Sequence, residues 1–119
     1  MIVASINEIP EVPWENPLFT SKEVTSQKLI PESRDYLMSV VNFGKGVRNK
    51  FHTHESDQIL IITKGKGIVA TENEQRLVCP GDIVLFPAGE KHWHGATDDS
   101  EFSHIYIIKA GAKTTQLED

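Results

Sequence analysis

The feature that most constrains this fold is a succession of short strand-like runs separated by turn residues. Runs rich in Val, Ile, Phe and Tyr occupy residues 24–30, 36–43, 58–63, 67–72, 75–78, 82–86, 92–96 and 102–109. Turns such as Pro80-Gly81-Asp82 lie between them, and no long stretch keeps the period of an amphipathic helix. Many short strands at close, regular spacing predict an all-β protein built as an antiparallel sandwich or barrel.

The order of residues within the runs predicts which side chains share a face, because successive side chains of a strand point to opposite sides. The run 58–63 is apolar on both faces, which predicts a strand covered on two sides. In the run 102–109, His104 shares a face with Phe102 and Ile108. We therefore expect His104 to point into the barrel if these two apolar residues do.

The length of 119 residues suits one domain, since domains cluster at about 100–150 residues. We divide the chain into an N-terminal arm of about residues 1–23, a barrel of about residues 24–109 and a polar tail of residues 110–119. The tail is predicted to be frayed, because chain ends are poorly ordered unless something ties them down.

The arm carries three prolines between residues 10 and 17, which disfavour a long helix. It also carries Trp14, Leu18 and Phe19, whose apolar side chains need cover from water. We expect the arm to pack on the outside of the domain or on a second subunit. We therefore predict a homodimer that exchanges strands or arms across a two-fold interface.

Charge and composition argue against several classes of protein. The net charge is -5 and no Lys/Arg run exists, which disfavours nucleic-acid binding because that needs a basic face. No apolar stretch approaches the roughly 20 residues of a membrane-spanning helix, and residues 1–8 show no signal-peptide pattern. The single cysteine, Cys79, excludes an internal disulfide and is expected to be a small packed residue. This composition fits a reducing cytoplasm.

Four side chains predict a mononuclear metal site. His52 and His54 alternate along one run and can point at one spot, and Gln58 follows four residues later. His92 comes from a distant hairpin, and neutral imidazole is the commonest metal ligand in proteins. The alternatives are that both histidines of the first run are surface residues on a turn, and that Gln58 caps a turn or fills the barrel.

These residues belong to two motifs that resemble those of the cupin family. The first is Gly46-x5-His52-x-His54-x3-Gln58-x6-Gly65, and the second is Gly81-x5-Pro87-x-Gly89-x2-His92. The resemblance covers residues 46–96 and implies a cupin jelly-roll β-barrel. Two positions depart from the usual motifs. Gln58 stands where the first usually has Glu, and Ala96 stands where the second usually ends in Asn.

The Gln variant resembles the small manganese-dependent cupins with hydroxynitrile lyase activity. This resemblance implies that His52, His54, Gln58 and His92 hold one divalent metal ion per chain, with manganese favoured. It also places two further histidines near the metal, which correspond to His94 and His104. Nitrogen and oxygen donors without a thiolate leave iron, nickel, cobalt and zinc open as well.

Three imidazoles and an amide oxygen leave the full positive charge on the metal, which favours Lewis-acid chemistry. We expect a lyase-like enzyme in which His94 or His104 is the general acid/base for a small hydroxy or carbonyl compound. The alternatives are a cupin dioxygenase and a non-catalytic cupin that binds a metal or ligand. The alternatives for the two histidines are that His94 is a buried imidazole satisfied by a backbone carbonyl group and that His104 is a core residue.

Overall fold

The computed structural model describes all 119 residues and contains eleven β-strands and one short 3-10 helix, Ile6–Glu8. The strands are β1 (Val12–Pro13), β2 (Val24–Lys28), β3 (Tyr36–Phe43), β4 (His52–His54), β5 (Gln58–Gly65), β6 (Gly67–Thr71), β7 (Gln75–Val78), β8 (Ile83–Phe86), β9 (His92–Ala96), β10 (Phe102–Lys109) and β11 (Thr114–Gln116). Each of the eight predicted runs overlaps one of these strands. Periodicity and turn residues therefore predict the strands of the barrel well.

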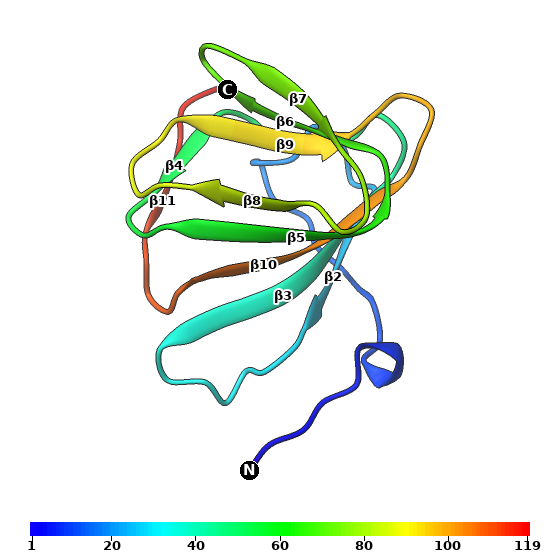
Figure 1. The fold of residues 1–119 in the computed structure, drawn as a ribbon, viewed down its shortest axis with the longest axis vertical. Helices are drawn as coiled ribbons and strands as arrows, with labels where there is room; N and C mark the ends of the chain where they lie inside the picture. Colours follow the sequence, from blue (N-terminus) through cyan, green and yellow to red (C-terminus); the bar gives the residue numbers. More distant parts are fainter.

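The strands form two antiparallel sheets that face each other and enclose the core (Figure 1). One sheet has the order β1-β2-β3-β10-β5-β8, and the other has the order β11-β4-β9-β6-β7. This arrangement is the predicted all-β jelly roll. Strand β10 lies in the middle of the larger sheet, between β3 and β5. No helix of the structure is both long and apolar enough to cross a membrane.

The core lies between the sheets and contains the alternate side chains that the sequence assigns to one face. Phe102, Tyr106 and Ile108 of β10 are buried, and His104 is buried with them. The conditional prediction that His104 points inward is therefore confirmed. The outer face of β5 is different, because Ile59 keeps 36% of its surface exposed. The prediction that this strand is covered on both sides is wrong, since no element packs over the outer face of the larger sheet there.

The arm packs on its own barrel. Strand β1 pairs with β2, and Phe19 is buried. The rings of Trp14 and Phe19 meet edge to face at 5.0 Å, and Phe19 meets Phe43 in the same manner at 5.9 Å. The first alternative for the arm is thus the one seen, while residues 1–8 are exposed and extend away from the barrel (Figure 1).

The tail is ordered, so the prediction that it is frayed is wrong. Strand β11 pairs with β4, where Thr114 lies opposite His54. Beyond it, the Glu118 carboxylate accepts hydrogen bonds from Arg48 at 2.9 and 3.0 Å and from the backbone N–H of Phe51. A backbone ladder and an ion pair therefore tie down a segment that has almost no apolar side chains. Cys79 also departs from expectation, because it is exposed in the turn after β7.

Candidate metal centre

Three histidines from two paired strands converge on one point. His52 and His54 lie on the same face of β4, and His92 at the start of β9 is the direct partner of His52 across the ladder. All three side chains are buried, and one nitrogen from each ring lies within 4.8 Å of the other two. The alternative that the first two are surface residues is excluded by this burial. The cluster has the donor type and the spacing to hold a metal ion.

In each of these rings, the Nδ1 atom lies within hydrogen-bond distance of an oxygen atom of the protein. His52 Nδ1 lies 2.6 Å from the carbonyl oxygen of Lys50, and His92 Nδ1 lies 2.8 Å from that of Glu90. A carbonyl oxygen can only accept, so each Nδ1 carries the proton and each Nε2 of the neutral ring keeps its lone pair. This is how a second shell orients metal-ligating histidines.

The third ring, that of His54, has a side-chain hydroxyl group as its Nδ1 partner instead of a backbone carbonyl group. His54 Nδ1 lies 2.8 Å from the hydroxyl oxygen of Thr114, a residue of the tail. His54 Nε2 is buried and has no hydrogen-bond partner in the protein. A lone pair buried in this way needs an electrophile or a donor, which a cation at the centre of the cluster would supply.

Gln58 meets the same point from the first residue of β5. Its Oε1 lies 3.0 Å from His92 Nε2, so two acceptor atoms face each other if Nε2 keeps its lone pair. Either the amide turns its NH₂ group toward His92, or a cation lies between the two atoms. A bound cation would take the lone pairs of both atoms and remove the repulsion between them. The contact between Gln58 and His92 and the unpartnered nitrogen of His54 both fit a site that would hold a cation.

Burial keeps the cluster neutral at physiological pH. Burial, with a smaller contribution from repulsion by His52, lowers the pKa of His54 to about 4 and that of His92 to about 3. Burial also lowers the pKa of His52. Protons and metal ions compete for the same lone pairs, so depressed pKa values leave these rings ready to bind a cation.

The remaining two histidines lie beside the cluster, inside a cavity of about 320 Å³. His94 follows His92 on the inner face of β9, and His104 comes from β10 in the opposite sheet. Their rings meet edge to face with centroids 4.8 Å apart. His94 Nδ1 and both ring nitrogens of His104 are buried without a hydrogen-bond partner. The structure therefore brings all six predicted site residues to one region.

The wall of this cavity includes residues that the sequence did not identify as part of a site. Trp14 and Phe19 of the arm cover one side, and Thr114 and Gln116 of β11 contribute another. Asn49, before β4, completes the contact with His94. No periodic pattern marks these positions, because each reaches the cavity through a long-range contact. The volume lies within the range of about 300–1,000 Å³ for small-molecule sites.

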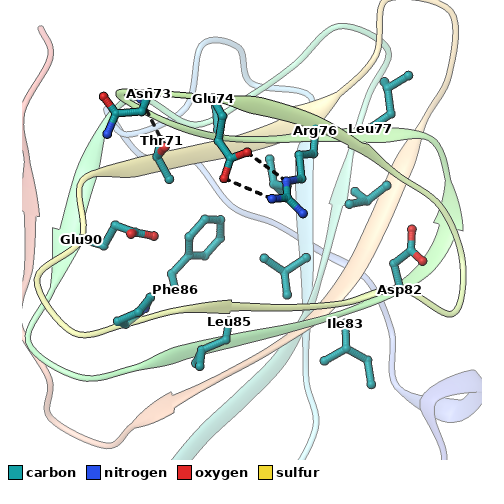
Figure 2. Close-up of a pocket in the computed structure, with 15 residues that line it drawn as sticks. Thr71, Asn73, Glu74, Arg76, Leu77, Asp82, Ile83, Leu85, Phe86 and Glu90 are labelled. Atoms are coloured by element: carbon teal, nitrogen blue, oxygen red, sulfur yellow. Dashed lines mark hydrogen bonds and ion pairs between the residues drawn. The ribbon is translucent and has the colours of Figure 1, made fainter.

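A larger hollow of about 900 Å³ lies between β7 and β8, the edge strands of the two sheets (Figure 2). Its lining contains no histidine, and its charged residues include the Glu74–Arg76 ion pair at 3.1 Å. Phe86 belongs to its lining and also stacks on the His92 ring at 3.9 Å. Phe86 thus separates this hollow from the histidine cluster, and we place the chemistry inside the barrel.

Comparison with known proteins agrees with this geometry. A family model described as a cupin domain matches residues 39–108, which is more than half of the chain. This chain is a cupin. The matched region begins in β3 and ends in β10, so it includes every histidine described above.

Relatives of this cupin include an enzyme. The (R)-mandelonitrile lyase of Granulicella tundricola is 43% identical over 68 residues, which are 56% of this chain and 52% of that protein. The match thus spans only about half the length of the lyase. A cupin-like protein from Thermotoga maritima is 30% identical, with a TM-score of 0.83 over 90% of this chain and 84% of its own. The polyketide cyclase of Streptomyces resistomycificus has a TM-score of 0.88 at 14% identity, covering 100% and 87%, and shares the fold alone.

Proposed function

We propose that this cupin is a metal-dependent lyase that acts on a small hydroxy or carbonyl compound, with cyanohydrin cleavage as the model reaction. The observation that carries the proposal is the pair His94 and His104, whose buried rings have unpartnered nitrogens and line a cavity beside the histidine cluster. A cupin that binds a metal only to stabilise its barrel would not need two further buried imidazoles with unpartnered nitrogens. The similarity to a mandelonitrile lyase supports the choice of reaction.

In this proposal His52, His54, His92 and Gln58 hold one divalent ion, with manganese as the proposed metal. All four donors are neutral, so the bound ion keeps its full charge and supplies Lewis acidity toward a hydroxyl or nitrile group. An iron-dependent dioxygenase remains the second candidate for such a centre, but the amide of Gln58 stands where a charge-neutralising carboxylate would suit iron better.

The protein residues would move the proton. One of the rings of His94 and His104 accepts the hydroxyl proton of the cyanohydrin as the carbon–carbon bond breaks and the carbonyl group forms. The electron pair of that bond leaves with cyanide, and the imidazolium returns the proton to give hydrogen cyanide. Trp14, Phe19 and Tyr106 in the cavity wall exclude water and contact the organic group of the substrate.

The direct test is the release of benzaldehyde from mandelonitrile by protein loaded with Mn²⁺, measured with and without a chelator. We expect activity that depends on the metal and that falls by roughly 10²–10⁴-fold when the acid/base histidine is replaced by alanine. His94→Ala and His104→Ala should both keep the metal. Full activity in both variants would contradict the proposed proton transfer, and loss of metal in either would make that histidine a ligand.

We further propose a cytoplasmic homodimer. The arm no longer supports a dimer, because Trp14 and Phe19 are covered within one chain. The support now comes from the edge strands, where Leu77 and Ile83 keep 74% and 72% of their surface exposed. The exposed thiol of Cys79 suits a reducing compartment. Light scattering at micromolar concentration should give twice the chain mass, and a monomer mass would reject the dimer.

A further inference from the structure

Asn49 is bound to His94 by three hydrogen bonds. The Asn49 backbone N–H donates to the His94 carbonyl oxygen at 3.0 Å, and the His94 backbone N–H donates to Asn49 Oδ1 at 2.8 Å. The third contact joins Asn49 Nδ2 and His94 Nε2 at 3.2 Å. Asn49 is 3% exposed and lies in the irregular segment between β3 and β4. Both hydrogen bonds of its side chain are made with His94.

These contacts determine which nitrogen of His94 carries the proton. A backbone N–H can only donate, so the Asn49 atom facing it must be the amide oxygen. The other end of the amide is then the NH₂ group, which also can only donate. His94 Nε2 must accept that bond with its lone pair. In the neutral ring the proton consequently lies on Nδ1, the nitrogen that has no partner in the protein.

The segment that carries Asn49 is held tightly against β9. Arg48 forms an isolated bridge with Gly95, and the Ala96 N–H donates to the Val47 carbonyl oxygen at 2.8 Å. A Cβ atom at Gly95 would overlap Arg48, so the absence of a side chain there permits the close approach. Backbone contacts thus hold Asn49 beside His94, and turning its amide away would break the two hydrogen bonds that this side chain makes with His94.

We propose that Asn49 is a positioning residue that holds His94 in the tautomer protonated at Nδ1, so that His94 meets a ligand as a hydrogen-bond donor. His104 is then the ring that accepts a proton, because neither of its nitrogens is committed to a protein group. The tautomer follows from the geometry alone. Only this division of roles rests on the proposed lyase function.

The proton on His94 Nδ1 would determine which kind of ligand atom can lie against it. A buried N–H without a partner favours a ligand that offers a lone pair there, such as a carbonyl oxygen, a nitrile nitrogen or cyanide. A ligand that offers only a donor at that position would leave two N–H groups facing each other. We therefore expect small carbonyl or nitrile compounds to bind and alkylammonium ions of matched size, which have no lone pair, to bind poorly.

The test of the tautomer is long-range ¹H–¹⁵N NMR of the histidine rings in protein loaded with Zn²⁺, which is diamagnetic. The His94 signals are assigned by their loss in His94→Gln. We expect the ¹⁵N shift of an unprotonated nitrogen at Nε2 and that of a protonated nitrogen at Nδ1. A protonated Nε2 in the wild-type protein would overturn the inference, whatever the protein proves to catalyse.

The substitution Asn49→Asp tests whether Asn49 determines the tautomer of His94. The two side chains have the same shape, and one carboxylate oxygen still accepts from the His94 backbone N–H. The other oxygen now requires a donor, so Nε2 should gain a proton. Asn42→Asp is the matched control, since Asn42 bonds to Thr25 and Ser103 on the outer face of β3 and contacts no histidine. An unchanged Nε2 signal in Asn49→Asp would refute the positioning role.

If Asn49→Asp does not fold, Asn49→Ala replaces it and should give a mixture of both tautomers. A single unchanged tautomer in that variant would also refute the role. In the activity assay Asn49→Asp should lower kcat roughly 10²-fold, the scale for one pre-organised donor, with KM changed less than about threefold. If wild-type protein cleaves no cyanohydrin while the NMR result holds, the proposed function fails and the tautomer assignment stands.

Discussion

Thr114→Val should weaken metal binding without unfolding the tail. The substitution keeps the shape of the side chain and removes the hydroxyl oxygen that lies 2.8 Å from His54 Nδ1. Because β11 pairs with β4 through backbone groups, the strand itself should remain in place. His54 would then lose the contact that orients its ring, while His52 and His92 keep theirs.

The size of the effect follows from the exposure of Thr114. Removing a second-shell partner of a metal-ligating histidine typically costs 10–100-fold in affinity. Thr114 is exposed, so water can reach His54 Nδ1 and replace part of the lost hydrogen bond. We therefore expect a loss of metal affinity at the lower end of this range, which is an increase of about tenfold in Kd or about 1.4 kcal/mol. The free energy of unfolding of the metal-free protein should fall by about 1 kcal/mol or less.

The assay is a competition titration with a chelator of known affinity, carried out with Zn²⁺ and with Mn²⁺. Thr115→Val is the matched control, because Thr115 is the next residue of the same strand and its side chain points to the other face. A Kd for Thr114→Val within twofold of the control would show that the Thr114 hydroxyl does not orient His54 for metal binding. A loss of binding beyond 100-fold would mean that the tail detaches, which circular dichroism and limited proteolysis would detect.

Three further predictions concern the cluster and the cavity. His52→Ala combined with His54→Ala should abolish the expected stoichiometry of about one divalent ion per chain, measured by elemental analysis, and a chelator should lower the melting temperature of the wild-type protein only. Gln58→Glu should keep or tighten metal binding yet lower lyase activity, because the added negative charge reduces Lewis acidity; a parallel rise in both would contradict this. Burial lowers the pKa of His104 from 6.5 to about 4, so the unfolded state binds a proton first as pH falls below 6.5, and stability is lost down to about pH 4. Relative to His104→Phe, the wild type should lose about 2 kcal/mol between pH 7 and pH 5 in urea unfolding, and equal losses would show that His104 is not buried in solution.

Much of the fold could be predicted because local periodicity and tertiary burial agree in the barrel strands. The alternation in β9 and β10 correctly placed His94 and His104 on inner faces. The tail could not be predicted in the same way. Thr114 is 60 residues away from His54 in sequence, and β11 is stabilised by backbone pairing and the Glu118–Arg48 ion pair rather than by apolar side chains. Hydrophobic patterning contains no signal for such a strand.

Asn49 was missed for a related physical reason. It lies in a segment without regular structure, and its amide matters only because Gly95 lets that segment approach β9 closely. The surface against which the arm packs could not be predicted either, because the barrel of the same chain or that of a second subunit could have covered Phe19. Sequence periodicity specifies which face a residue occupies, whereas these contacts depend on which segments meet in space.

The energetic cost of burying the histidines gives a final argument for where a ligand lies. Each buried polar atom without a partner costs about 1–3 kcal/mol, and four such atoms belong to His54, His94 and His104. A cation would satisfy the nitrogen of His54, and Asn49 already satisfies one of the two nitrogens of His94. His104 has no protein partner for either nitrogen, although it is completely buried. A residue needed only for packing would avoid that cost, so the burial of His104 favours a ligand beside it.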